Sequence, residues 1–382
     1  MLIDVIAGAR PNFIKIASIL HAMDAVRRAG APLQYRLVHT GQHRDRNMSA
    51  AFFEQLHIPE PQVQLGVGGG TQAEMTAQIM LRYEAILRTG KPAMVLVVGD
   101  VTSTLACAVA AKKMNDIPVI HVEAGIRSGD WTMPEEINRI VTDSVTDYFF
   151  TTSHSANDNL RNTGIPASSI FFVGNTMIDT LLRHRSAFAR PQQWDEIGLE
   201  EGKYFVLTLH RAALADDGKK LERVLRTVAE QRAGYPVIFP VHPRTANTLK
   251  KIRYEAPEGM HLTTPLPYLE FNYLVEHAAA VLTDSGGITE EATVLGVPCM
   301  TLRSSTERPE TCTIGTNELV GTSPDNIAKA MQCLLRGEWK IGSIPPLWDG
   351  RTSERIVRVL SALANGESPE CYSLAGGNVN AL

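Results

Sequence analysis

The sequence predicts an α/β fold with two successive parallel sheets, and three observations lead to this prediction. Short apolar runs rich in β-branched residues alternate along the chain with segments long enough to form helices. Several of these runs lack an alternating polar face, which is typical of parallel strands covered by helices on both sides. The alternation breaks in a polar stretch at residues 183–202 and then restarts, so the 382 residues are expected to form two domains of similar size.

The first predicted domain opens with a strand at residues 2–7, followed by a Gly-Ala-Arg-Pro turn and a helical pattern. Further strands are predicted at residues 35–38, 94–98, 119–122, 148–151 and 170–173, with a helix at 102–114. In the second domain we expect strands at 204–208, 237–239, 280–282 and 298–302, and helices at 221–231 and 289–295. The boundary is placed just after the VGNTMID motif, which gives domains at 1–182 and 183–351, and helix 352–364 is expected to join the first domain.

Composition and charge exclude several classes of protein. Lys and Arg number 37 against 41 Asp and Glu, so no bulk positive field attracts nucleic acid or an anionic membrane surface. The five cysteines are scattered and form no CxxC pair, which fits neither a disulfide framework nor a zinc site. No apolar run approaches the ~18 residues of a membrane span, and the first residues do not resemble a secretory signal. We therefore expect a cytoplasmic protein without nucleic-acid or membrane partners.

Chemically active residues follow the predicted strands of both domains. In open parallel sheets, ligands bind beyond the carboxyl ends of the strands. The residues at these places are Arg10, His39, Asp100, Glu123, His210, His242 and the Ser285-Gly286-Gly287 turn. Because both halves of the chain contribute, a cleft between the two sheets is the expected site.

The segment LTDSGGITEEA at residues 282–292 is the strongest indication of a phosphate-binding site. Asp284 or Ser285 can cap a helix there, and the two glycines allow a diphosphate to approach the backbone N–H groups. Glu291, further along the same helix, could accept hydrogen bonds from a ribose diol. The alternative interpretation is an ordinary capped helix with glycines in a tight turn.

Two cations and several acids complete the candidate set. Arg10 and Lys15 could neutralise a phosphate, although a solvated pair on the first turns of the helix is the alternative; no Walker or GxGxxG pattern is present. Asp100 and Glu123 end adjacent strands, where neighbouring charges can supply an acid and a base. Pro134 predicts a helix start with Glu135 in its first turn, which could equally serve the helix dipole.

Histidines end two strands of the second half. His210 and His242 are each followed by an Arg within two residues, which suits a charged phosphosugar, whereas a structural role is the alternative. His39, His43 and His57 are spaced too irregularly for a metal site, and no metal is assigned.

A series of motifs in this chain resembles that of the non-hydrolysing UDP-N-acetylglucosamine 2-epimerases. In chain order the motifs are GARPNFIK, TGQHRD, VVGDVTST, HVEAGIRSGD, MPEEINR, VGNTMID, LTLHR, PVHPRT, LTDSGGITEEA and STERPE. The resemblance covers roughly residues 1–335. It implies a GT-B-like fold of two Rossmann-like domains facing a central cleft, with the nucleotide on the C-terminal domain. It also implies interconversion of UDP-N-acetylglucosamine and UDP-N-acetylmannosamine without a cofactor, for cell-surface polysaccharide precursors, by a homodimer.

The resemblance also implies roles for individual residues. The catalytic acids would be Asp100, Glu123 and Glu135, with His210 as the catalytic histidine, and Arg10 and Lys15 would be cations of the cleft. The contacts to UDP would come from Ser285, Gly286, Gly287, Glu291 and Arg308, with Phe271 near the uracil and His242 near the phosphates. The implied reaction eliminates UDP across carbons 1 and 2 of the sugar and adds it back after a proton reaches the opposite face.

The chain departs from the family pattern at three places. Asn12 stands where the common bacterial enzymes carry Glu, and Ala212-Ala213 replaces a polar continuation after the LTLHR motif. Residues 66–71 lack the Arg-Gln pair with which bacterial members bind a second substrate molecule as activator. The other contacts of such an activator would be Gln42, His43 and Arg211, so the sequence leaves substrate activation open.

Other functions also remain open from the sequence. The motif GARPNFIK and the triple glycine also resemble the epimerases of UDP-2,3-diacetamido-2,3-dideoxyglucuronate, which is the alternative substrate. A GT-B glycosyltransferase would use the same UDP site, and a non-catalytic sugar-nucleotide sensor would need no acids. The acids at both Asp100 and Glu123, with the MPEEINR turn, argue against the glycosyltransferase, and the complete set of acids and the histidine argues against the sensor.

Overall fold

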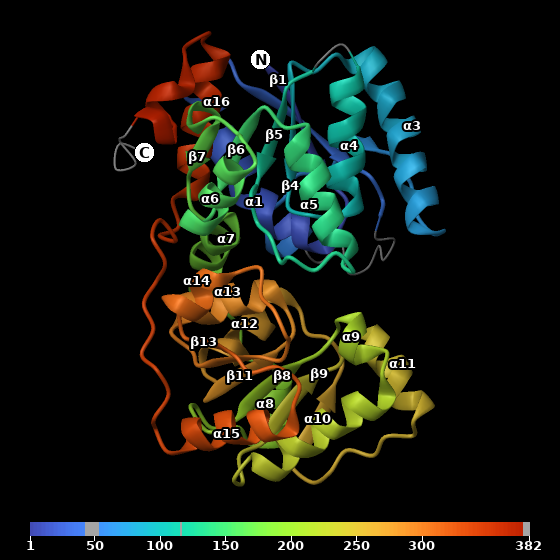
Figure 1. Cartoon of the computed structure of the whole chain (residues 1–382), viewed down its shortest axis with the longest axis vertical. Coiled ribbons are helices and arrows are strands. Elements are labelled where there is room, and N and C mark those ends of the chain that lie inside the picture. Colours follow the sequence, from blue (N-terminus) through green and yellow to red (C-terminus); the bar gives the residue numbers. More distant parts are fainter. Residues whose placement is uncertain (43–52, 115–116, 377–382) are drawn as a thin grey trace. The chain divides into compact units, whose positions relative to one another are not determined.

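The computed structural model describes residues 1–42, 53–114 and 117–376, and the chain forms two compact units (Figure 1). Unit 1 contains residues 1–183 and the C-terminal segment from residue 346. Unit 2 contains residues 184–345. Each unit is built around one sheet whose paired strands all run parallel in the described part of the chain, which confirms the predicted fold class.

Unit 1 holds a seven-stranded sheet in the order β3-β2-β1-β4-β5-β6-β7. Its strands are β1 (Leu2–Ala7), β2 (Gln34–His39), β3 (Val63–Gln64), β4 (Met94–Val98), β5 (Val119–Val122), β6 (Tyr148–Thr151) and β7 (Ile170–Phe172). Its helices are α1 (Arg10–Arg28), α3 (Gln72–Gly90), α4 (Thr102–Lys113), α5 (Pro134–Ser144), α6 (His154–Asn162), α7 (Thr176–His184) and α16 (Thr352–Ala364). Short 3₁₀ turns of unit 1 lie at Ala167–Ser169, Pro369–Tyr372 and Leu374–Gly376, and a further one at Arg185–Ala187 belongs to unit 2.

The helices of unit 1 form in places that their sequences dictate. Thr71 caps α3, because its hydroxyl accepts from the Glu74 N–H while the Glu74 carboxylate accepts from the Thr71 N–H. Small buried residues such as Ala106 and Cys107 let α4 pack closely on the sheet, next to α3 and α5.

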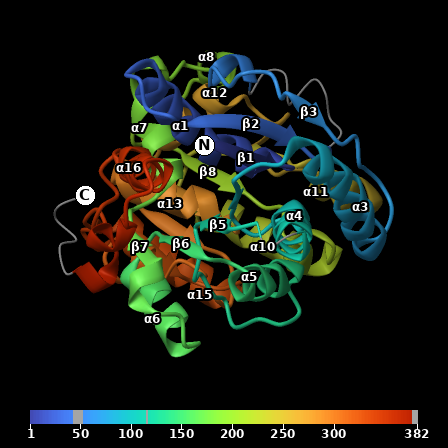
Figure 2. The same ribbon diagram turned by 90° about the horizontal axis from the view of Figure 1, so that it is seen from above.

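The C-terminal segment completes unit 1. The carboxylate of Asp179 in α7 accepts the backbone N–H groups of Thr352 and Ser353 at 3.0 and 2.6 Å, which fixes the start of α16. Helix α16 then lies beside α1 (Figure 2). Trp348, which the sequence analysis assigned to the second domain, is 1% exposed and donates from its indole N–H to the Thr152 carbonyl of unit 1.

Unit 2 holds a six-stranded sheet in the order β10-β9-β8-β11-β12-β13. Its strands are β8 (Phe205–Thr208), β9 (Val237–Pro240), β10 (Met260–Thr263), β11 (Ala280–Thr283), β12 (Cys299–Thr301) and β13 (Asn317–Leu319). Its helices are α8 (Gln192–Ile197), α9 (Ala212–Ala215), α10 (Gly218–Gln231), α11 (Pro243–Lys251), α12 (Tyr268–Glu276), α13 (Gly286–Leu295), α14 (Pro309–Thr313) and α15 (Pro324–Leu335).

Strand β8 shows why the apolar runs have no polar face. Phe205 and Leu207 pack into a cluster with residues of α10 and α15, whereas Val206 packs into a second cluster with α12 and α13. Successive side chains of a strand point to opposite faces, so a strand covered on both faces needs apolar residues at every position. The central strands were predictable for this reason.

Three strands were missed by the sequence analysis, namely β3, β10 and β13. Each lies at an edge of its sheet. These edge strands bury less apolar surface, and in β10 only Met260 is buried, whereas Leu262 is 38% exposed. Among the described residues, no helix combines the length and apolar character needed to cross a membrane.

Candidate functional site

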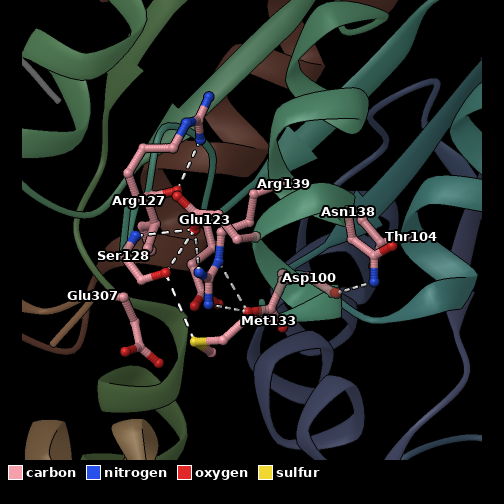
Figure 3. A network of polar contacts seen from close by, with 12 residues as sticks. Asp100, Thr104, Glu123, Arg127, Ser128, Met133, Asn138, Arg139 and Glu307 are labelled. Atoms are coloured by element: carbon pink, nitrogen blue, oxygen red, sulfur yellow. Dashed lines mark hydrogen bonds and ion pairs between the residues drawn. The ribbon is translucent and has the colours of Figure 1, made fainter. Parts of the chain in front are cut away.

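The first group of candidate residues lies at the carboxyl end of β4. Asp100 follows this strand, and its carboxylate accepts from Arg139 of α5 at 2.5 Å to Nη2 and 3.1 Å to Nε (Figure 3). The Arg139 side chain is 3% exposed, whereas that of Asp100 is 25% exposed. The Asp100 carboxylate is therefore held by a buried guanidinium and still reaches solvent.

Glu123 directly follows the neighbouring strand β5 and has an unusual backbone conformation. Its φ angle is +70°, a left-handed value that costs a residue other than glycine free energy and that clusters at functional sites. The carboxylate is buried and forms an ion pair with the ammonium group of Lys15 from α1, itself buried. The structure thus brings Lys15 and Glu123 together, next to the strand that carries Asp100.

Asn12, the position where the family pattern has Glu, links the ends of two strands. Its side-chain oxygen accepts from the N–H groups of Gly8 and Ala9 after β1, at 3.2 and 3.1 Å. Its side-chain N–H₂ donates to the carbonyl of Val98 at the end of β4, at 2.9 Å. An amide can accept and donate at once, whereas a carboxylate could not make the bond to Val98.

The two glutamates after Pro134 have different surroundings. Pro134 is the first residue of α5, as predicted, and both glutamates lie in its first turn. Glu136 accepts from the N–H groups of Ser128 and Gly129 at 2.9 and 3.0 Å, and from Arg139. Burial would raise the pKa of Glu136, but these hydrogen bonds and the Arg139 charge lower it below its ordinary value. Glu135, the residue predicted to be catalytic, is partly exposed.

The remaining candidates of unit 1 lie near the starts of α1 and α4. Arg10 is the first residue of α1. The side-chain oxygen of Gln42 accepts from the N–H and hydroxyl groups of Ser103, at 3.1 and 2.8 Å, and so is fixed onto α4. His43 lies outside the described residues.

In unit 2, His210 follows β8 and is oriented by a buried carboxylate. Asp284, 1% exposed, lies 2.9 Å from Nδ1 of His210 and also accepts the backbone N–H groups of His210 and Arg211. Burial alone would raise the pKa of Asp284, but these bonds and the His210 charge hold it below its ordinary value. With Nδ1 directed at Asp284, Nε2 is the nitrogen left for a ligand, and the His210 side chain is 37% exposed.

Of the two predicted caps of α13, Asp284 and Ser285, the structure has Ser285 at the N-cap position. Ser285 is the N-cap residue by its backbone, but no side-chain cap bond forms. The Asp284 carboxylate instead turns back to the end of β8. Gly286 and Gly287 open α13, and a Cβ at Gly286 would come within 3.0 Å of the Glu307 carboxylate. The first turn of this helix offers its N–H groups to an anion.

Glu291 lies in α13, where it is fully enclosed. Its carboxyl accepts from the hydroxyl of Tyr268 at 3.0 Å. Burial and the neighbouring Glu290 raise the pKa of Glu291 to about 7, although the Tyr268 bond acts in the opposite direction. Arg308, also buried, pairs with Glu290 through its Nε.

Three further candidates complete unit 2. His242 is the N-cap residue of α11, where its Nδ1 accepts from the Arg244 N–H, and its ring centroid is 5.6 Å from that of His210. Phe271 of α12 packs, half-buried, against the core of unit 2. Arg211 pairs with Glu307 at 3.0 Å. In the described part of the chain, no group of three or more His, Cys, Asp or Glu side chains could hold a metal ion.

Comparison with known proteins gives a consistent result. A family model described as UDP-N-acetylglucosamine 2-epimerase matches residues 25–361. The UDP-N-acetylglucosamine 2-epimerase of Methanocaldococcus jannaschii is 38% identical over 373 residues, which are 94% of this chain and 99% of the relative. The UDP-2,3-diacetamido-2,3-dideoxy-D-glucuronate 2-epimerase of Pseudomonas aeruginosa is 40% identical over 367 residues, which are 95% and 100%.

Solved structures agree with these relatives. The crystal structure of the Methanocaldococcus jannaschii enzyme in complex with UDP-GlcNAc and UDP has a TM-score of 0.85 at 38% identity, and covers 94% of this chain and 99% of that chain. A Staphylococcus aureus protein solved with UDP has a TM-score of 0.84 at 30% identity, with 95% and 97% covered. A glycosyltransferase at 11% identity and a TM-score of 0.56 shares the fold alone. The fold is therefore GT-B-like, with two Rossmann-like domains.

Proposed function

The chain belongs to the UDP-N-acetylglucosamine 2-epimerase family, and we propose that it interconverts UDP-N-acetylglucosamine and UDP-N-acetylmannosamine. The observation that carries this proposal is the pair of carboxylates after β4 and β5, each bound to a buried cation. Asp100 is held by Arg139, and Glu123 by Lys15. Two acids fixed at adjacent strand ends can take a proton from one face of a sugar and return one to the other.

The proposed reaction needs such residues because the hydrogen on carbon 2, beside the acetamido group, is weakly acidic. A base removes this proton while the bond from carbon 1 to the UDP oxygen breaks, and UDP leaves with the electron pair. The product is a glycal with a double bond between carbons 1 and 2. UDP then adds back to carbon 1 as carbon 2 receives a proton on the opposite face, so atoms and charge balance over the cycle.

We assign the acid–base work to Asp100, Glu123, Glu135 and His210. Asp284 supports the role of His210, because it selects the ring orientation that leaves Nε2 for a proton transfer. In the proposal the two units act together, with the sugar handled mainly by unit 1 and the nucleotide by unit 2. Neither unit alone should catalyse the reaction.

Retention of UDP between the two half-reactions is the second requirement. We assign it to Arg10, Lys15, Arg308, His242 and the start of α13 at Ser285, Gly286 and Gly287. Positive groups and helix N–H groups stabilise the charge that develops on the departing diphosphate. Glu291 would accept hydrogen bonds from the ribose, and Phe271 would contact the uracil.

The alternative substrate is UDP-2,3-diacetamido-2,3-dideoxyglucuronate, and the similarity of the Pseudomonas aeruginosa relative supports testing it. Both substrates would undergo the same chemistry at carbon 2. The glucuronate carries an additional carboxylate, which requires an additional cation near carbon 6. Both sugars should therefore be assayed with the same preparation.

The deciding experiment is incubation with each UDP-sugar in deuterated water, without an acceptor. The epimerase proposal expects deuterium at carbon 2 of both epimers, and a glycosyltransferase or a sensor would incorporate none. Asp100→Asn and Glu123→Gln should each reduce incorporation by about 100-fold or more, as expected for loss of an acid–base group. Glu84→Gln, which removes an exposed carboxylate of α3, is the matched control and should behave as wild type. Full activity in either of the first two variants would refute the assignment.

The proposal includes a cytoplasmic homodimer that needs no activator. Sedimentation of the purified chain at several concentrations tests the dimer. A hyperbolic rate curve from either epimer alone would support independence from an activator, whereas a requirement for the other epimer would contradict it.

A further inference from the structure

The backbone that carries Asp100 is held through three successive carbonyl groups. The carbonyl oxygens of Val98, Gly99 and Asp100 each accept a hydrogen bond from a side chain of a different element. The donors are Nδ2 of Asn12 in α1, Nε2 of His121 in β5 and Nδ2 of Asn138 in α5, at 2.9, 2.8 and 2.8 Å. Figure 3 shows the last of these bonds beside the Asp100 carboxylate.

Of the three donors, His121 is the one whose ring contacts an oxygen atom at each end. Its side chain is 0% exposed, and its Nδ1 lies 2.7 Å from Oδ1 of Asp143 in α5. Both ring nitrogens therefore face oxygen atoms, since the Gly99 carbonyl lies at Nε2. A neutral imidazole donates from one nitrogen only. The lone pair of its other nitrogen would then face an oxygen atom and be repelled by it. A ring with a proton on each nitrogen satisfies both contacts.

The groups around His121 stabilise this doubly protonated ring. Asp143 also binds Arg127 at 2.7 Å and the Gly125 N–H at 3.1 Å. Burial would raise the pKa of Asp143, but the bond from His121 and the charges of His121 and Arg127 lower it. Asp143 thus stays ionised and acts as the counter-charge of a buried cation.

We propose that His121 is a positioning residue that donates from both ring nitrogens, as an imidazolium, and so fixes the Gly99 carbonyl and the place from which Asp100 meets its substrate. Glu123 directly follows β5, the strand that carries His121, so this strand positions Glu123 through its backbone and Asp100 through the bond to the Gly99 carbonyl. Gly99 has a φ of +69°, and a Cβ there would lie 3.1 Å from Nζ of Lys15, so a small shift of this turn would also disturb the Lys15–Glu123 pair. The inference rests on the proposed catalytic role of Asp100.

The protonation state can be measured without any assay of activity. Nitrogen NMR of the wild-type chain labelled with ¹⁵N-histidine should show a bonded hydrogen on both ring nitrogens of His121, assigned through bonds from its backbone. Exchange of these hydrogens with solvent should be slow because the ring is buried. A single ring N–H on His121 at the pH of maximal activity would overturn the proposal.

The effect on catalysis is tested with His121→Gln. Glutamine can still donate to the Gly99 carbonyl but cannot also bind Asp143, so the turn should be held less rigidly. We expect kcat to fall about 10- to 100-fold, with KM changed less than about threefold, because misplacement of a reacting group affects the chemical step more than binding. The matched control is His154→Gln at the exposed start of α6, which should leave both constants unchanged.

Asp143→Asn provides a second variant if His121→Gln does not fold. It removes the counter-charge and should produce a His121 ring with one N–H and the same loss of kcat. An unchanged kcat in a folded His121→Gln or Asp143→Asn protein would refute the positioning role. If the wild-type chain epimerises none of the UDP-sugars, the proposed function fails, while the NMR measurement still judges the imidazolium.

Discussion

Replacement of Glu291 by Gln should remove a cost of folding that increases with pH. Burial raises the pKa of Glu291 from 4.5 to about 7, even though Tyr268 donates a hydrogen bond to it. In the unfolded chain the carboxyl titrates at its ordinary value, so between pH 4.5 and about 7 the folded state binds more protons than the unfolded state. Stability therefore falls as the pH rises through this window.

The magnitude follows from the size of the shift. A difference of about 2.5 pKa units, at about 1.4 kcal/mol per unit, gives about 3 kcal/mol over the whole window. Most of this change lies between pH 5 and pH 8. The free energy of unfolding of Glu291→Gln minus that of the wild type should therefore rise by about 2–3 kcal/mol between these two pH values.

Hydrogen exchange followed by mass spectrometry measures the difference in the free energy of unfolding separately for unit 2, which contains Glu291. Peptides from β8 and β11 report the opening of unit 2, and peptides from β4 and β5 of unit 1 serve as an internal reference. Comparison of variant and wild type at the same pH removes the intrinsic pH dependence of exchange. Glu258→Gln, at an exposed position of unit 2, is the control and should show a constant difference. A constant difference for Glu291→Gln as well would refute the reasoning.

Three further predictions concern single side chains. Gly99→Ala should destabilise the protein by about 1–2 kcal/mol in urea unfolding, because the residue has a φ of +69°. It should also lower kcat, because the new Cβ presses on Lys15. Asp284→Asn should lower kcat by about 100- to 10,000-fold in steady-state kinetics, because an amide no longer selects the ring orientation of His210. Asp179→Ala should cost about 1–3 kcal/mol and expose α16 to limited proteolysis, because two backbone N–H groups lose a buried acceptor.

Matched variants separate the causes in these predictions. Gly164 also has a positive φ, but a Cβ there would meet nothing within 4 Å, so Gly164→Ala measures the conformational cost alone and should leave kcat unchanged. Equal kcat in both alanine variants would contradict the contact with Lys15. Asp325→Asn changes an exposed carboxylate of unit 2, and a kcat for Asp284→Asn as high as in this control would exclude the orienting role. Unchanged proteolysis of α16 in Asp179→Ala would show that the helix is held by other contacts.

The central strands and the residues that follow them could be predicted from the sequence for one physical reason. A strand buried on both faces is mostly apolar, as β4, β5 and β8 are, so the polar residue that follows each run is conspicuous. Asp100, Glu123 and His210 follow these strands as predicted, and their catalytic roles remain proposals. The edge strand β7 was predicted because its three residues are apolar and buried, whereas the edge strands β3, β10 and β13 include exposed positions and were missed.

The partners of the candidate residues could not be predicted, because they depend on packing between distant segments. Asp284 has the sequence position of a helix cap, but its carboxylate binds the turn after a different strand. The choice between Glu135 and Glu136 depends on how far α5 is rotated about its axis, and the sequence shows only two adjacent acids. His121 lies inside an apolar run, where a histidine gives no sign of the Asp143 carboxylate that faces it.

The path of the chain through the two units sets an order for folding during synthesis. Unit 2 is one continuous segment, whereas unit 1 is interrupted by it and finished by α16. As the chain leaves the ribosome, the seven strands of unit 1 emerge first. Asp179 and α1 can make their contacts with α16 only later, because this helix follows all of unit 2 in the sequence. Domains generally fold as units as they emerge, so unit 2 can complete its core while unit 1 is still open. Unit 1 is therefore synthesised first but completes its packing last.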